Sequence, residues 1–224
     1  MKYRIDPLKE KTLNMRRSPA HLSALLLPLS LAFGCAEQPS EEAQAAIAQT
    51  PSSAQLAPEQ EAFWNRLSEH CGNAYQGDVV HATPHYAGTR NYEVLLAHFR
   101  ECSDERIHIA VHVDDDRSRN WLLTREEGTI RLKHDHRNPD GTEEEITQYG
   151  GDAPVPGLPH RQIFWADEHT AQILPERDDN FWFMHFVGDD TFSYGVHWPK
   201  QGHSIRREFD LSTPVEPPPA PWGY

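Results

Sequence analysis

The stretch "RIHIAVHVDDDRSRNWLLTREEGTIRLKHDH", residues 106–136, decides the fold class of this chain. Apolar residues occupy every second position at its start, namely Ile107, Ile109, Val111 and Val113. This period is typical of a β-strand with one buried face. Two further apolar runs follow, and Glu127-Gly128 separates them as a tight hairpin turn would. The stretch therefore predicts three consecutive antiparallel strands.

Similar patterns extend through most of the chain. Strands are expected at residues 75–81, 92–101, 106–113, 120–125, 129–136, 144–149, 162–165, 181–187, 191–198 and 204–211. The segment 58–72 predicts an N-terminal helix, and 167–174 predicts one short inserted helix capped by Asp167. The chain is therefore predicted to be mainly β. A single antiparallel meander should close into a barrel or a strongly curved sheet, because such a sheet has to remove its edges.

A leading helix followed by successive hairpins resembles the calycin, or lipocalin-like, architecture. This resemblance implies a calycin-like barrel and concerns topology only, since the lipocalin sequence motif does not occur. A closer resemblance, to a family of small uncharacterised bacterial secreted proteins or lipoproteins, covers most of residues 70–215. It rests on "HCGNAYQGDVV", "RECSDERIHIAVHVDDDRSRNWLLTR", "LKHDHRNPDGTEEEITQYGG" and "RREFDLSTPV". That family implies export and a shared fold, and it implies no activity.

The N-terminus has the pattern of an export signal. Arg16-Arg17 precedes a mostly apolar run over residues 22–33, which is shorter than the roughly 20 residues needed to span a bilayer. Gly34-Cys35 resembles the end of a bacterial lipobox, in which the cysteine is lipidated; cleavage after Ala36 is the alternative. We predict a signal peptide (1–35), a disordered tether (36–57), a β-barrel-like domain (58–213) and a proline-rich tail (214–224).

Export would place the protein in the cell envelope, anchored by lipid on Cys35, or else freely secreted or periplasmic. Cys71 and Cys102 would then remain in an oxidising compartment, where an even pair predicts one disulfide. Two separate buried thiols are the alternative.

The charge of the chain limits its partners. The formal charge is −13, and the leader to Cys35 holds six of the 21 Lys and Arg and two of the 34 Asp and Glu, so the remainder carries −17. Such a surface repels phosphate backbones and anionic lipid, which excludes nucleic acid and leaves a lipid anchor as the means of membrane attachment. We expect a monomer whose partner is a small ligand or an envelope protein.

One predicted hairpin concentrates histidines and glutamates. Strand alternation puts His134 and His136 on one face, about 7 Å apart. A four-residue loop would place Glu143 and Glu145 opposite them, whereas a three-residue loop with a glycine bulge would place Glu144 opposite His136. Both registers stay open, because the sequence alone does not choose between them.

Imidazoles and carboxylates are the usual zinc ligands in proteins. His134, His136, Glu143 and Glu145 are therefore candidate ligands for a divalent metal such as zinc. The alternative is an imidazole–carboxylate hydrogen-bond ladder that fixes the register of the hairpin, in which case no cofactor is expected.

Two neighbouring strands are rich in aromatic residues. "NFWFMHFV", residues 180–187, is apolar on both faces, and "FSYGVHW", residues 192–198, adds further aromatics. One face should form core, and the other could line a cavity, a second packing layer or a partner surface. An aromatic cup suits small apolar ligands, with ordinary core filling as the alternative. The candidate ligand-binding residues are Phe181, Phe183, His185, Phe192 and Tyr194.

The sequence lacks the common catalytic signatures, such as Gly-x-Ser-x-Gly, His-Glu-x-x-His or a phosphate loop, and no catalytic residue is assigned. We predict an exported, non-enzymatic β module that binds a small ligand or a partner. The alternative is a metal-binding protein or a metal-dependent hydrolase that uses the His134/His136 hairpin.

Overall fold

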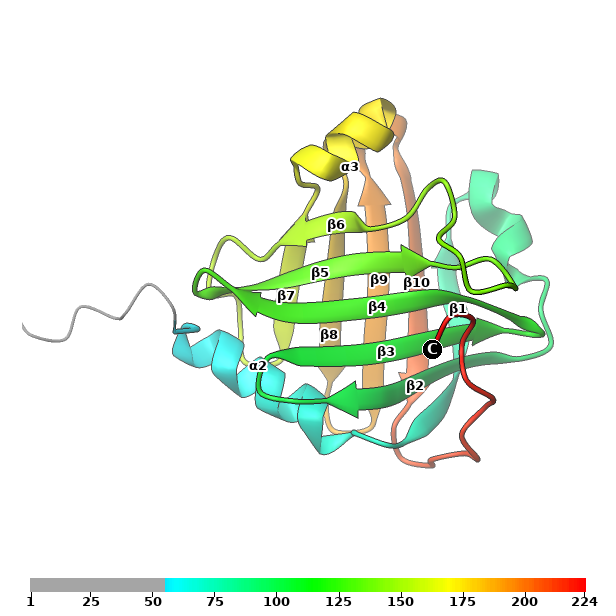
Figure 1. The fold of residues 1–224 in the computed structure, drawn as a ribbon, viewed down its shortest axis with the longest axis horizontal. Coiled ribbons are helices and arrows are strands. Elements are labelled where there is room, and N and C mark those ends of the chain that lie inside the picture. The colour runs from blue at the N-terminus through cyan, green and yellow to red at the C-terminus, as the bar shows by residue number, and fades with distance from the viewer. Residues whose placement is uncertain (1–54) are drawn as a thin grey trace, which may run out of the picture. The chain divides into compact units, whose positions relative to one another are not determined.

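The computed structural model describes residues 55–224, which form a ten-stranded antiparallel sheet (Figure 1). The strands are neighbours in chain order, and the first, β1 (Ala74–Ala82), also pairs with the last, β10 (His203–Asp210). The sheet therefore wraps into a nearly closed barrel, and the predicted calycin-like meander is confirmed. The predicted leader, Cys35 and nearly all of the predicted tether lie outside the described residues. Within residues 55–224, no helix is long and apolar enough to cross a membrane.

The predicted strands mostly recur with shifted ends. Besides β1 and β10, the strands are β2 (Leu95–Cys102), β3 (Arg106–Val113), β4 (Asp116–Glu126), β5 (Thr129–His136), β6 (Tyr149–Asp152), β7 (Arg161–Trp165), β8 (Phe181–Val187) and β9 (Thr191–Trp198). The helices are α2 (Pro58–Glu69) and α3 (Glu168–Ile173), with short 3₁₀ turns η1 (Pro84–Arg90), η2 (Pro175–Arg177) and η3 (Pro199–Gln201). Asp167 caps α3 as predicted, because its side chain accepts a hydrogen bond from the Thr170 backbone N–H. The three 3₁₀ turns were not predicted.

The strand predicted at 144–149 is the exception, because β6 begins only at Tyr149. The residues after β5 form a loop, which is held by hydrogen bonds within the loop and to the last residue of β5. Asn138 N–H donates to Thr142 O at 2.8 Å, and the Thr147 hydroxyl oxygen accepts from His136 N–H at 2.7 Å. These local bonds occupy groups that a continuous ladder would have used.

The seam between β6 and β7 closes the barrel without a regular ladder. Gly151 lies so close to the Trp165 carbonyl that a Cβ on Gly151 would overlap it. Asp167 N–H donates to Gly150 O at 2.9 Å, and the Thr170 hydroxyl bonds both the N–H and the carbonyl of Gly150 at 2.8 Å. The start of α3 thus supplies the hydrogen bonds that a paired strand would provide elsewhere.

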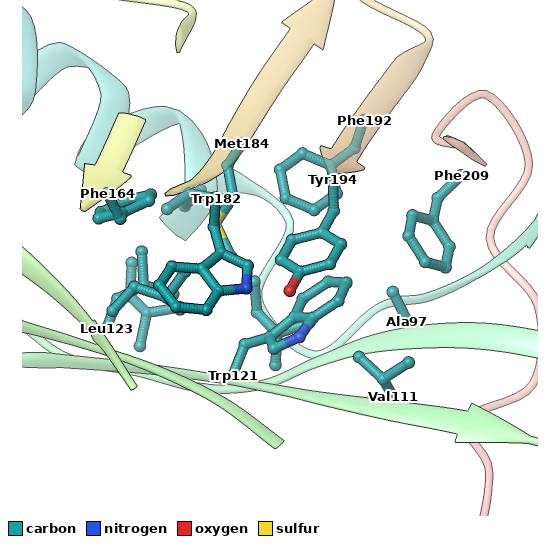
Figure 2. Packing of buried hydrophobic residues seen from close by; sticks show 14 of the residues in the cluster. Ala97, Val111, Trp121, Leu123, Phe164, Trp182, Met184, Phe192, Tyr194 and Phe209 are labelled. Atoms are coloured by element: carbon teal, nitrogen blue, oxygen red, sulfur yellow. The ribbon is translucent and has the colours of Figure 1, made fainter. Parts of the chain in front are cut away.

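Helix α2 closes one end of the barrel with three fully buried side chains, Phe63, Trp64 and Leu67. The interior beyond them is mainly aromatic and aliphatic. Figure 2 shows Trp121, Trp182 and Tyr194 meeting there from β4, β8 and β9. Burying a side chain of this size contributes about 1.5–3 kcal/mol, so these rings are a major source of stability.

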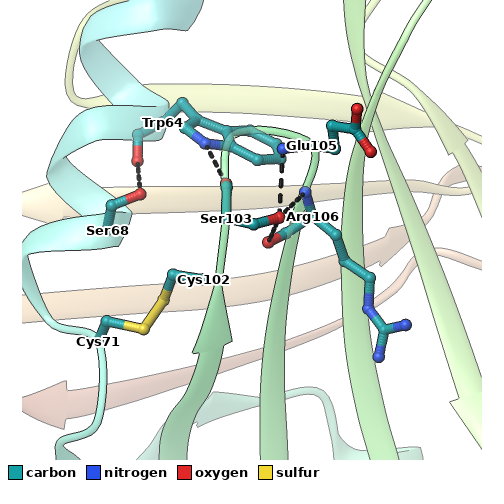
Figure 3. The surroundings of a disulfide bond; sticks show 7 residues. All are labelled: Trp64, Ser68, Cys71, Cys102, Ser103, Glu105 and Arg106. Atoms are coloured by element: carbon teal, nitrogen blue, oxygen red, sulfur yellow. Dashed lines mark hydrogen bonds between the residues drawn. A yellow bond between two sulfur atoms is a disulfide. The ribbon is translucent and has the colours of Figure 1, made fainter.

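A disulfide fastens α2 to the sheet, as predicted. Cys71 follows α2 and Cys102 ends β2, and their Cα atoms are 6.0 Å apart (Figure 3). Close by, the Trp64 indole N–H donates to the Ser103 carbonyl at 3.3 Å. The helix is therefore held by a covalent bond, a hydrogen bond and its buried face.

The C-terminal tail crosses the outer face of the sheet near β3 (Figure 1). Trp222 N–H donates to Arg117 O at 3.1 Å, and the Tyr224 hydroxyl donates to Asp135 Oδ2 at 2.7 Å. The Tyr224 ring lies 4.5 Å from the ring of His108, measured between centroids. The tail thereby covers polar side chains that would otherwise lie on an open sheet face.

Candidate functional site

A cavity of about 190 Å³ lies inside the barrel. It is at the end away from α2, because Phe63 packs against Phe186 at a centroid distance of 5.7 Å, whereas the cavity is bounded by Trp198 at the far end of β9. The 3₁₀ turns η1 and η2 contribute Tyr86 and Arg177 to its mouth. Drug-sized sites occupy about 300–1,000 Å³, so this cavity suits a small ligand.

Six tyrosine and tryptophan rings form a large part of the walls. Trp121 and Tyr194 stack at a centroid distance of 3.9 Å with an interplanar angle of 22°. Tyr86 and Trp198 stack at 4.5 Å and 15°. In each stack the two rings come from elements far apart in the chain, so barrel closure is what builds the walls.

His134 is buried among these rings, and both of its ring nitrogens are bonded. Nδ1 lies 3.1 Å from the Tyr149 carbonyl oxygen, and Nε2 lies 2.6 Å from the Tyr194 hydroxyl. A carbonyl only accepts, so Nδ1 carries the proton and Nε2 accepts from Tyr194. Burial is the main cause that lowers the pKa of His134 to about 3, which keeps the ring neutral.

This neutral histidine should make the fold sensitive to acid. An unfolded-chain histidine takes up a proton below a pKa of 6.5, whereas His134 in the fold resists protonation down to about 3. The unfolded state binds more protons between these values, so the free energy of unfolding falls as the pH drops through that window. By pH 5, His134 alone should remove about 2 kcal/mol.

The measurement is urea unfolding at pH 7.5 and at pH 5.0 for the wild type and for His134→Gln. Other buried histidines also titrate, so the comparison of the two proteins isolates His134. The loss of stability on acidification should be about 2 kcal/mol smaller in His134→Gln. An equal loss in both proteins would contradict the neutral buried state.

The other candidate metal ligands diverge. His136 Nδ1 lies 3.6 Å from Glu144 Oε2, which matches the three-residue-loop register at that position. Glu143 instead accepts from Arg137 at 3.2 Å, and Glu145 is exposed. Among residues 55–224, no three His, Cys, Asp or Glu side chains are grouped as a metal site requires. The structure therefore does not bring the four predicted ligands together.

The predicted ligand-binding residues separate into two groups. Phe181, Phe183 and His185 lie on the outer face of β8, where Phe181 stacks on His197 at 4.8 Å. None of the three lines the cavity in the barrel: β8 is apolar on both faces, and the inward set is Trp182, Met184 and Phe186.

Residues Phe192 and Tyr194 of β9 do point inward, with different roles. Phe192 is fully buried core, 5.4 Å from Phe99 between ring centroids. Tyr194 is the one predicted residue of the set that lines the cavity.

Most of the lining was not among the candidates from the sequence, and this includes its three charged residues, Arg119, Arg177 and Arg207. They are the only residues with a full charge in the lining, and no Asp or Glu faces the cavity within the described part of the chain. Arg119 forms an ion pair with Asp116, and Arg177 Nε lies 3.5 Å from Glu176 Oε1. A signal did exist, since Arg119 and Arg207 interrupt the inward-facing positions of β4 and β10.

Comparisons with known proteins found no matching family model, no similar curated protein and no similar solved structure. The resemblance to a family of small bacterial secreted proteins therefore stays a prediction, and the geometry of the barrel is the basis for any statement about function.

Proposed function

We propose that this chain is an exported, non-enzymatic binding module that holds a small ligand in its barrel. The observation that carries the proposal is the cavity of about 190 Å³ at the end away from α2. A ligand there would contact stacked aromatic rings on several sides, which is the lining that small-molecule sites use. The Cys71–Cys102 disulfide supports an oxidising compartment, and lipid attachment at Cys35 or free secretion are the two modes of export.

The hydrogen bonds of His134 support a binding role over a catalytic one for this residue. A general base needs a free lone pair aimed at the substrate. His134 uses its lone pair to accept from Tyr194, and its proton to bond Tyr149. The imidazole is therefore part of the wall.

The proposal predicts that filling the cavity blocks ligand binding. Val113 lines the mouth and is partly exposed, so Val113→Trp can occupy the space with little cost to folding. Benzyl alcohol, a small neutral aromatic probe, should bind the wild type with a dissociation constant of about 1 mM or below. Val113→Trp should weaken that binding at least tenfold in a ligand-observed NMR titration.

The matched control is Val187→Trp, the same change at a position 47% exposed on the outer face of β8. It should bind benzyl alcohol like the wild type. Equal binding by Val113→Trp and the wild type, or no binding to the wild type by benzyl alcohol, phenol or indole, would refute the cavity as a ligand site.

A further inference from the structure

Arg207 occupies an unusual place for a charged residue. In the register of the sheet it lies between Val79 of β1 and Tyr194 of β9. The flanking inward residues on its own strand are Ile205 and Phe209, which are 4% and 0% exposed. The guanidinium therefore enters the cavity from the middle of an apolar wall.

No counter-charge accompanies Arg207 in the described part of the chain. Neither a hydrogen bond nor an ion pair to the Arg207 side chain is found within residues 55–224, and burial is the main cause that lowers the pKa of its guanidinium. The nearby positive charge of Arg119 works in the same direction. The Arg207 side chain is only partly exposed, so water screens its charge incompletely, and an anion that enters this cavity would supply the missing counter-charge.

The cavity also contrasts with the rest of the molecule. The chain carries −13 overall, yet the three charged residues that line the cavity are all arginine. The acidic composition of the chain would not by itself place three arginines around one cavity, so the positive charge there is a local feature. It indicates a site for negative charge.

The shape of the cavity narrows the class of anion. The guanidinium fork of Arg207 matches a carboxylate, which it can bind through two parallel hydrogen bonds. Tyr194 donates its hydroxyl proton to His134 and is not free for an anion, so the arginines are the charged donors in the lining. Flat rings such as Trp121 would lie against a planar ligand, and about 190 Å³ leaves no room for a long chain.

We propose that the cavity binds a small planar carboxylate of the benzoate class, with the carboxylate on Arg207 and the ring between the aromatic walls. This inference rests on the proposed function and specifies its ligand. Phosphate and chloride share the negative charge and lack the planar ring, so the experiment includes them as competitors.

The test compares benzoate with benzyl alcohol, its neutral counterpart, on the full-length protein at pH 7.5. Benzoate should bind at least tenfold more tightly than benzyl alcohol in the NMR titration, which corresponds to about 1.4 kcal/mol. Arg207→Met should abolish this preference, so that benzoate and benzyl alcohol bind the variant with equal affinity. Arg207→Lys should retain part of the preference, because it keeps the charge and loses the fork.

The control is Arg206→Met, the same change at an exposed position of the same strand. It should keep the full preference for benzoate. A second readout is the melting temperature without ligand. Arg207→Met should raise it, because the variant removes a partly buried charge that has no counter-charge, whereas a structural role for Arg207 would make it fall.

The outcomes separate the two proposals. Binding of benzyl alcohol without a preference for benzoate would overturn the carboxylate inference and leave the cavity as a ligand site. Failure of both probes to bind would overturn both. Displacement of benzoate by an equal concentration of phosphate or chloride would show an inorganic anion site and would also overturn the benzoate class.

Discussion

Replacing Arg137 with methionine will lower the free energy of unfolding by about 3–5 kcal/mol, because it leaves a buried carboxylate without its cation. Asp135 is fully buried on the outer face of β5. Arg137 Nε lies 3.0 and 2.9 Å from its two carboxylate oxygens. Gln148 and Tyr224 donate the remaining hydrogen bonds at 2.5 and 2.7 Å. Neither of these neutral donors can balance the charge.

Urea unfolding at pH 7.5 measures the effect. The matched control is again Arg206→Met, which breaks an exposed pair with Glu208 at 3.4 Å and should cost less than about 1 kcal/mol. Adding Asp135→Asn to Arg137→Met should recover part of the loss, because it removes the stranded charge. Equal losses of unfolding free energy in Arg137→Met and Arg206→Met would show that the buried Arg137–Asp135 pair contributes no more than an exposed pair.

The same network holds the C-terminal tail. The Tyr224 hydroxyl donates to Asp135, and the Arg137 guanidinium lies 5.7 Å from the centroid of the Tyr224 ring. Loss of Arg137 should therefore loosen the last residues as well as the sheet beneath them. Tail release and sheet stability are coupled through one carboxylate.

Removal of the disulfide will have the next largest effect. The bond joins residues 31 apart, and in the chain-entropy model a loop of this length is worth about 3–4 kcal/mol. The double variant Cys71→Ser/Cys102→Ser should lose this amount in urea unfolding. Cys71 is exposed, so dithiothreitol should produce the same loss in the wild type.

The comparison is best made in a Cys35→Ser background, which leaves the two paired cysteines as the only thiols. Dithiothreitol should then leave the double serine variant unchanged. If reduction of the parent protein shifts its urea midpoint by no more than it shifts that of the double variant, the disulfide contributes nothing to stability.

Much of the fold could be read from local patterns. Strands β8 and β9 begin and end where alternation and turn residues predicted, because these signals lie within a few neighbouring residues. The prediction of a strand over residues 144–149 was wrong, and the cause is also local. Loop residues such as Thr147 bond to the end of β5 and delay the strand, and such side-chain bonds have no simple sequence signature.

The candidate site was less predictable. Strands β8 and β9 both contribute to the cavity lining, yet the β8 residue that does so is Trp182 and none of the candidates Phe181, Phe183 and His185. Phe183 packs over Gly195 on the outside of the sheet, and Trp182 packs inside. Both faces look equally apolar in sequence, so periodicity contains no information that distinguishes them.

Alternation, turn residues and cysteine number are properties of the chain, and they were enough to predict most of the strands, their arrangement as a meander and the pair of cysteines available for a disulfide. Which side chains enter the barrel, and what accompanies them there, depends on tertiary packing. Arg207 shows the reason most clearly. Its lack of a counter-charge depends on residues from β1, β4 and β9, which closure of the sheet brings around it and which no local pattern could specify.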